Sequence, residues 1–165
     1  NWMNQQYLLK LPEEEYFKMI DDVIQKGDYH DQDPGKIRQA AEILKTRLVT
    51  LSDLNQKLGL FFEENPEIKD LQAIEVLKED NSKTVLKEFL QQAENLDQLT
   101  SENLGQLVKS VQKSTGIKGR GLWMPLRCAI TREVSGPELP AMLDFFGGEK
   151  CLHLIRQTLE NPSLN

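Results

Sequence analysis

The sequence predicts an all-α fold built around two small hydrophobic cores, and three observations carry this prediction. Apolar residues recur at three- and four-residue steps along most of the chain, as they do on one face of a helix. Proline, glycine, serine and threonine stand at the ends of these stretches, where helices begin and end. No segment alternates apolar and polar residues long enough to indicate a half-buried strand. We therefore expect helices packed as antiparallel or orthogonal pairs.

The first part of the chain is expected to form three helices. The spacing predicts them over Glu13–Lys26, Pro34–Thr50 and Asp53–Leu58. Asp33 is the expected N-cap of the second, because it precedes a proline that suits the first helical position. The third is expected to begin after Ser52 and to end at Gly59.

An acidic, weakly periodic stretch separates this part from the rest. It covers residues 63–80 and predicts a connector with one short helix near Leu71–Leu77. We expect one helical subdomain over residues 1–66 and a second over 67–165. Four further apolar stripes predict helices around residues 86–93, 104–111, 139–146 and 152–159.

Composition limits the class of protein. The 165 residues are 39% hydrophobic and 28% charged, which is typical of a globular domain. No apolar run approaches the roughly 20 residues that cross a bilayer, and no signal peptide is visible. These features predict an intracellular, cytoplasmic protein with no membrane partner. Because the first residue is Asn, we expect a piece of a longer polypeptide.

A strongly basic segment stands out in this acidic chain. The net charge is -6, yet residues 103–132 contain no Asp or Glu. The same window carries six cations, Lys109, Lys113, Lys118, Arg120, Arg127 and Arg132. Its second half continues into KGRGLWMPLRCAITREVSGPEL, where Pro125 and Pro137 are each expected to lie at a helix start. Such a positive region predicts an anionic partner on one face.

The residues of an active site or metal site are missing. Cys128 and Cys151 are far apart in apolar helical contexts, so we expect buried, reduced thiols, with a disulfide or redox pair as the alternative. The two histidines, His30 and His153, have no spacing that could hold zinc. KGRG resembles a phosphate loop, but it lacks a preceding strand and the Lys-Ser/Thr pair. The sequence predicts a binding protein with no catalytic, cofactor or metal residues.

Two kinds of partner remain open from the residues alone. Lys and Arg bind phosphates, and unpaired bases stack on flat side chains, so the segment could bind RNA. It could equally form a helical protein-interaction module whose basic face meets an acidic protein. Trp123 is interpreted here as a core residue in preference to a stacking platform. The pattern alone favours a surface ion pair for Arg47, at the edge of its apolar stripe.

Several motifs resemble one family over essentially the whole chain. They are NWMN at residues 1–4, KTRLVTL at 45–51, GLFF at 59–62, KGRGLWMPLRCAITREVSGPEL at 118–139 and GGEKCLHLIRQTL at 147–159. Together they resemble the C-terminal portion of bacterial-type glutamyl-tRNA synthetase, and the WMPLR and GPEL motifs are the most specific. The resemblance implies an all-α anticodon-binding helical cage of two subdomains. The catalytic nucleotide-binding fold would lie upstream.

The resemblance also implies roles for individual residues. The arginine of R-x-x-T-L, here Arg47, would read an anticodon base. The other residues expected to line the pocket for anticodon bases are Met124, Arg127, Gly136, Pro137 and Leu139. Expected phosphate contacts are Lys109, Lys113, Lys118, Arg120 and Arg132. Two positions depart from many relatives, because this chain has Arg132 in place of a glycine and Gly136 in place of a polar residue.

The implied partners are the anticodon loop of the glutamate tRNA and an upstream catalytic domain of the same polypeptide. ATP and magnesium would be used by that parent enzyme, a glutamate-tRNA ligase, and this chain alone is expected to be non-catalytic. We expect a monomer.

Overall fold

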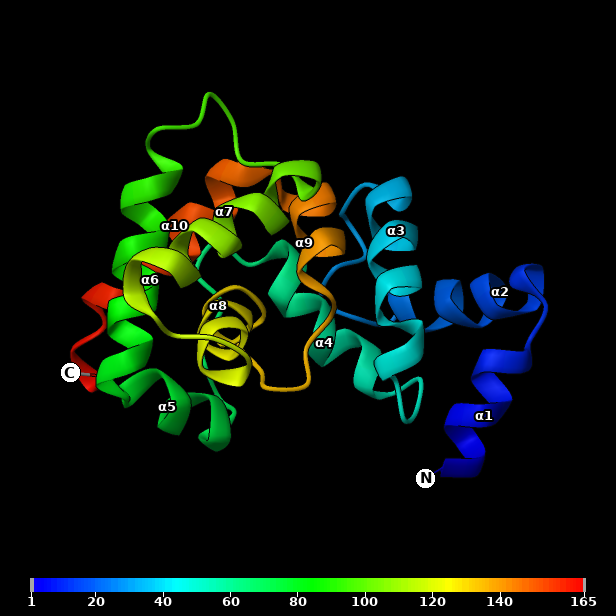
Figure 1. The fold of residues 1–165 in the computed structure, drawn as a ribbon. Helices are drawn as coiled ribbons and strands as arrows, with labels where there is room; N and C mark the ends of the chain where they lie inside the picture. The colour runs from blue at the N-terminus through cyan, green and yellow to red at the C-terminus, as the bar shows by residue number, and fades with distance from the viewer. Residues whose placement is uncertain (1, 165) are drawn as a thin grey trace. The chain divides into compact units, whose positions relative to one another are not determined.

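The computed structural model describes residues 2–164, except for the side chain of Trp2. All regular secondary structure in these residues is helical, which confirms the predicted fold class (Figure 1). The chain divides into two compact units, Asn1–Pro66 and Glu67–Asn165. Each unit has its own core. No helix in residues 2–164 is both long enough and apolar enough to cross a bilayer.

The first unit contains four α-helices and one 3-10 turn. They are α1 (Trp2–Lys10), α2 (Glu13–Ile24), α3 (Pro34–Leu44), η1 (Lys45–Arg47) and α4 (Asp53–Phe62). Tyr16 of α2 is completely buried, and its hydroxyl donates to the carbonyl of Ala41 at 2.8 Å. Asp33 caps α3 as expected, since its side chain accepts from the amide of Lys36 at 2.8 Å. Helix α1 was not predicted from the apolar spacing.

Two helix ends of this unit were predicted wrongly. The helix expected over Pro34–Thr50 stops at Leu44, because Leu48 is extended, with φ -77° and ψ 129°. That turn keeps Leu48 completely buried, so the apolar spacing continues although the helix has ended. Gly59 lies inside α4 instead of ending it. There the side chains of Glu63 and Tyr29 approach the backbone so closely that a Cβ on Gly59 would meet both.

The second unit contains six α-helices and a final 3-10 turn. They are α5 (Leu71–Lys78), α6 (Asp80–Ala93), α7 (Ser101–Thr115), α8 (Arg120–Thr131), α9 (Leu139–Phe146), α10 (Gly148–Glu160) and η2 (Pro162–Leu164). Helix α6 packs against α7, α8 and α10, and its Phe89 is completely buried (Figure 1). The short helix expected near Leu71–Leu77 is confirmed as α5.

The ends of α7 follow the expected rules. Thr100 and Asn103 form a reciprocal capping box at its start. Gly116 ends it in the left-handed conformation, with φ 72°. Helix α8 differs from expectation, because Pro125 lies within the helix and Pro137 precedes α9 without starting it. Since proline has no N–H, Pro125 closes no bond to the carbonyl of Gly121 one turn earlier.

Candidate nucleic-acid interface

Four of the predicted cations are exposed around the junction of α7 and α8. Lys109 and Lys113 lie one turn apart on α7, while Lys118 and Arg120 flank Gly119 at the start of α8. Gly119 has φ 61°, a conformation that glycine adopts without strain. No Asp or Glu lies in the first turn of α8. The amide end of this helix and its neighbouring cations therefore give this junction a positive potential.

Helix α8 presents a stripe of basic and apolar side chains, which we call the α8 stripe. It consists of Arg120, Trp123, Met124 and Arg127. These residues follow i, i+3, i+4, i+7 spacing, so they share one face of the helix. Most of the remaining helix surface is buried, including Leu122, Leu126 and Ile130, each no more than 1% exposed.

Trp123 belongs to this surface, and its interpretation as a core residue was wrong. It is 42% exposed. The spacing gave no signal of this exposure, because Trp123 stands three residues before Leu126 and seven before Ile130, which places it near their side of the helix.

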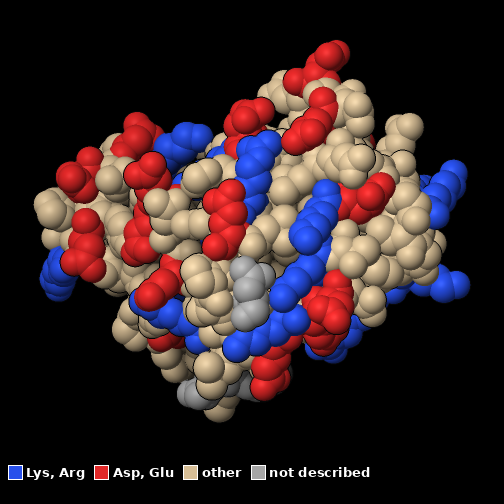
Figure 2. Space-filling view, turned by 90° about the vertical axis from the view of Figure 1, so that its left-hand side faces the viewer, with Lys and Arg blue, Asp and Glu red and all other residues tan. Residues whose placement is uncertain are grey.

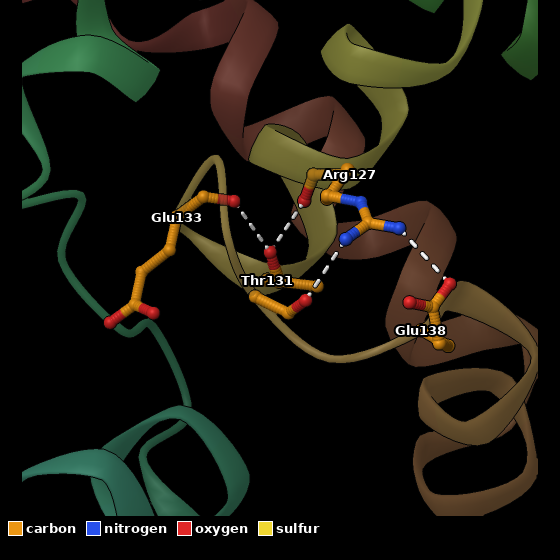
Figure 3. A network of polar contacts seen from close by, with 5 residues as sticks. Arg127, Thr131, Glu133 and Glu138 are labelled. Carbon is orange, nitrogen blue, oxygen red and sulfur yellow. Dashed lines mark hydrogen bonds and ion pairs between the residues drawn. The ribbon is translucent and has the colours of Figure 1, made fainter. Parts of the chain in front are cut away.

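Arg127 is held by two oxygen atoms of the segment that follows α8 (Figure 3). Its Nη1 donates to the carbonyl of Gly136 at 3.1 Å, and its Nη2 to the carboxylate of Glu138 at 3.0 Å. The side chain of Arg127 is 23% exposed, whereas that of Glu138 is 64% exposed. The hydroxyl of Thr131 lies 2.9 Å from the carbonyls of both Arg127 and Glu133. These contacts join the end of α8 to the turn before α9.

The turn residues expected to line a base pocket are buried. Gly136, Pro137 and Leu139 are all inaccessible, with Leu139 only 3% exposed. A Cβ on Gly136 would collide with the side chain of Thr131, which explains why this chain has glycine here. The side chains of these residues therefore shape the turn and offer little surface to a base.

Arg132 is also misassigned as a phosphate contact. It is 5% exposed, and it ends α8 with φ 63°. Its Nη1 donates to the carbonyl of Ala129 at 2.9 Å and to the hydroxyl of Thr158 at 2.7 Å, and Nη2 donates to Gln157. Its Nε has no hydrogen-bond partner among the described residues. Burial lowers the pKa of Arg132 to about 10. This cation ties α8 to α10 and does not face a ligand.

Arg47 lies in the first unit, in the short turn that follows α3. Its side chain is half-buried. The backbone on either side is fixed, because Gln5 donates to the carbonyl of Thr46 at 2.8 Å and Leu48 is in the core. The ammonium of Lys45 lies 4.6 Å from the centre of the Tyr16 ring. Arg47 therefore lies in a turn whose backbone is held on both sides, although α3 ends before it.

The thiols of the two cysteines are buried and unreactive. Cys128 and Cys151 are both free and completely inaccessible, as expected. Burial raises the pKa of each thiol to about 12. A thiol that stays protonated is a poor nucleophile. Within residues 2–164, no group of three or more His, Cys, Asp and Glu side chains could hold a metal ion.

Positive and negative side chains are interleaved on one face of the molecule. On the face shown in Figure 2, Lys and Arg side chains form narrow rows with Asp and Glu side chains beside them. Broad single-sign patches do not occur on that face.

Comparison with known proteins assigns the chain to a family. A family model described as an anticodon binding domain matches residues 6–159. The glutamate–tRNA ligase of Latilactobacillus sakei is 31% identical over 163 residues, covering 96% of this chain and 33% of the relative. That of Lactiplantibacillus plantarum is 35% identical over 153 residues, covering 90% and 31%.

The fold leads to the same proteins. A crystal structure of a glutamate tRNA ligase from Elizabethkingia meningosepticum, in complex with its amino acid, superposes with a TM-score of 0.69. The sequences are 22% identical, and the match covers 97% of this chain and 31% of that one. The chain thus spans about a third of the length of the relatives it matches, in their C-terminal third. Since the family model spans nearly all of it, this chain belongs to the family of anticodon binding domains.

Proposed function

We propose that this chain binds the anticodon loop of a glutamate-accepting tRNA, as the anticodon-reading part of a glutamate–tRNA ligase. The observation that carries the proposal is the α8 stripe next to the exposed cations of the α7–α8 junction. Unpaired bases stack on aromatic and guanidinium planes, and their edges bind planar donors. Phosphates bind Lys and Arg. The α8 stripe offers flat side chains for bases, and the α7–α8 junction offers cations for phosphates, within one helix and its start.

The residues divide into two roles. Arg47, Met124 and Arg127 contact bases, and Trp123 joins them as a stacking platform. Lys109, Lys113, Lys118 and Arg120 contact phosphates. Residues 1–66 and 67–165 act as two helical subdomains that each contribute to anticodon binding.

In the longer enzyme, binding here would orient the acceptor end of the tRNA toward a separate catalytic domain. Relatives are tRNA ligases, a class that uses ATP and magnesium to activate the amino acid. We propose that the present chain contributes recognition and no chemical step. In the cell it would act in the cytoplasm as part of a monomeric enzyme.

Titration of an anticodon stem-loop RNA over a salt series tests this function. Binding should weaken steeply as salt rises, and RNAs with altered anticodon bases should bind less well. Arg47→Ala should cost about 1 to 3 kcal/mol of binding and relax base choice. Lys118→Ala should weaken all RNAs alike and reduce the salt slope, unlike the matched exposed control Lys69→Ala.

Three outcomes would contradict the proposal. Absence of binding at low salt would overturn RNA recognition itself. Equal affinity for all anticodons would overturn base reading. Identical effects of Arg47→Ala and Lys118→Ala across RNAs would overturn the division of roles.

A further inference from the structure

Residues 132–138 connect α8 to α9, and we call them the α8–α9 turn. This turn supplies both acceptors that hold the guanidinium of Arg127, the main-chain carbonyl of Gly136 and the carboxylate of Glu138 (Figure 3). Because the N–H groups of an arginine lie in one rigid plane, these two contacts set the directions of the others. The position of the turn therefore decides how Arg127 meets a ligand.

One contact to the turn comes from a distant part of the sequence. Oδ2 of Asp70 accepts from the main-chain amide of Val134 at 2.9 Å, across 64 positions of the chain and at a part-buried site. Oδ1 of the same carboxylate accepts from the amide of Gln72 at 2.9 Å and caps α5. Hydrogen bonds to an ionised acceptor are stronger than neutral ones. Asp70 thus connects the α8–α9 turn to the start of α5, which packs against α8.

Two further contacts to the turn begin on α8 itself. They are made by the hydroxyl of Thr131, which donates to the carbonyl of Glu133, and by the guanidinium of Arg127. These contacts hold the turn against the helix that it follows. Asp70 adds a contact from a second helix, so it restrains the turn in a direction that contacts from α8 alone do not.

The charge of Asp70 would by itself oppose RNA binding. Its carboxylate lies near α8, since the pKa of the Cys128 thiol is raised by burial and, to a lesser extent, by Asp70. A negative charge there weakens the positive potential of α8 and repels phosphates. Electrostatics alone therefore predicts that removing Asp70 strengthens RNA binding.

We propose that Asp70 is a positioning residue for RNA binding, because its contact to the amide of Val134 fixes the turn that orients Arg127. The inference rests on the proposed function, in which Arg127 contacts a base. Asp70 does not touch the RNA in this proposal. Its removal should weaken binding, since a binding side chain works best when its supporting contacts hold it in one geometry. Charge and position thus predict opposite signs for the same substitution.

The experiment compares Asp70→Ala with Asp33→Ala in the intact chain, titrated with the anticodon stem-loop RNA. Both variants lose one negative charge and one helix N-cap, because Asp33 caps α3 through the amide of Lys36. The urea midpoints of both should fall. Asp70→Ala should weaken RNA binding about 3- to 10-fold, through the lost contact to the turn. Asp33→Ala should change affinity less than about 2-fold.

Two further measurements separate positioning from a general loss of structure. Asp70→Ala should reduce the preference for the unaltered anticodon over altered ones, because Arg127 is the group that loses its orientation. In an Arg127→Ala background, Asp70→Ala should weaken binding no further, although its effect on the urea midpoint should persist. Asp70→Asn keeps one acceptor oxygen and is used if Asp70→Ala does not fold. It should change affinity in the same direction by a smaller factor.

The inference fails separately from the proposed function. If the wild type binds the RNA but Asp70→Ala binds as tightly, more tightly, or no worse than Asp33→Ala, Asp70 does not position Arg127 and RNA recognition stands. An equal loss of affinity with and without Arg127 would also overturn the positioning role. If the wild type binds no RNA at low salt, the proposed function is wrong and the role of Asp70 falls with it.

Discussion

The two ends of helix α8 carry the same kind of side chain but place it in opposite surroundings. At the start, Lys118 and Arg120 are exposed. At the end, Arg132 is buried and donates to three neighbouring residues. A cation stabilises the C-terminal end of a helix and destabilises its N-terminal end, by about 0.3 to 1 kcal/mol each. Arg132 thus supports folding, whereas the cations at the start oppose the dipole, as is expected if they serve the proposed contacts to phosphate.

Removing Arg132 is expected to have the largest effect on stability, and it tests the difference between the two ends of α8. Arg132→Ala should lower the free energy of unfolding by about 2 to 4 kcal/mol, because Ala129, Gln157 and Thr158 lose a buried donor. Urea denaturation measures this change. Where the variant remains folded, its affinity for the stem-loop RNA should equal that of the wild type. If Arg132→Ala lost RNA affinity but kept the stability of the wild type, Arg132 would have to be part of the RNA-binding surface.

The matched change at the other end is Arg120→Ala. Its free energy of unfolding should stay within about 0.5 kcal/mol of the wild type, since the side chain is exposed. RNA binding should weaken and depend less on salt. If Arg120→Ala destabilised the fold as much as Arg132→Ala, the two ends would not differ in the way proposed.

The next effect concerns the turn that follows the buried end. Gly136→Ala should destabilise the fold by about 1 to 3 kcal/mol, because the added methyl meets the side chain of Thr131. Gly105→Ala is the control, since Gly105 lies inside α7 with no atom near the added Cβ. It should stabilise by about 0.5 to 1 kcal/mol. Urea midpoints decide between them, and equal shifts would contradict the packing at Gly136.

Much of the fold was predictable because apolar spacing and capping residues act locally. Helix α7 was predicted from its apolar stripe around residues 104–111, and Thr100 and Gly116 cap its two ends in the structure. Spacing failed at Leu48, which continues the stripe of α3 although the chain has become extended. Gly59 was read as a helix end, yet it serves a close approach of Glu63. Such tertiary packing leaves no mark in a local pattern.

The site was only partly predictable for a related reason. Counting cations identified Lys109, Lys113, Lys118 and Arg120, which the structure exposes. The same count included Arg132, whose burial depends on Gln157 and Thr158, some 25 residues away. Local charge therefore predicts where a positive segment lies. It does not predict which cations the fold itself uses.

The exposed face of α8 can be tested through its tryptophan. Trp123→Ala should weaken stem-loop binding by about 1 to 2 kcal/mol, because a stacking platform for a base is lost. Its stability should be little changed, since the side chain is 42% exposed. Leu71→Ala is the matched control, as Leu71 is 75% exposed on α5. Quenching of tryptophan fluorescence by the RNA provides a second measure, and equal effects of the two substitutions would contradict stacking.

The smallest effect at neutral pH comes from the buried face of the same helix. Cys128 of α8 and Cys151 of α10 have pKa values raised to about 12 by burial, against an ordinary 9.0. Above pH 9 the unfolded thiols lose protons that the folded thiols keep, so the unfolded state binds fewer protons and stability falls as pH rises. Below that pH both states are protonated, and the thiols make no difference.

Urea denaturation at pH 8 and pH 10 measures this dependence. The wild type should lose more stability between the two pH values than the double variant Cys128→Ala, Cys151→Ala, in which the titrating groups are absent. The tyrosines contribute in the same direction, because burial also raises the pKa of Tyr29 to about 12, but their contribution is common to both proteins. Equal losses would mean that the thiols ionise in the folded chain, and Cys128 would then not be sealed beneath the face that carries Trp123.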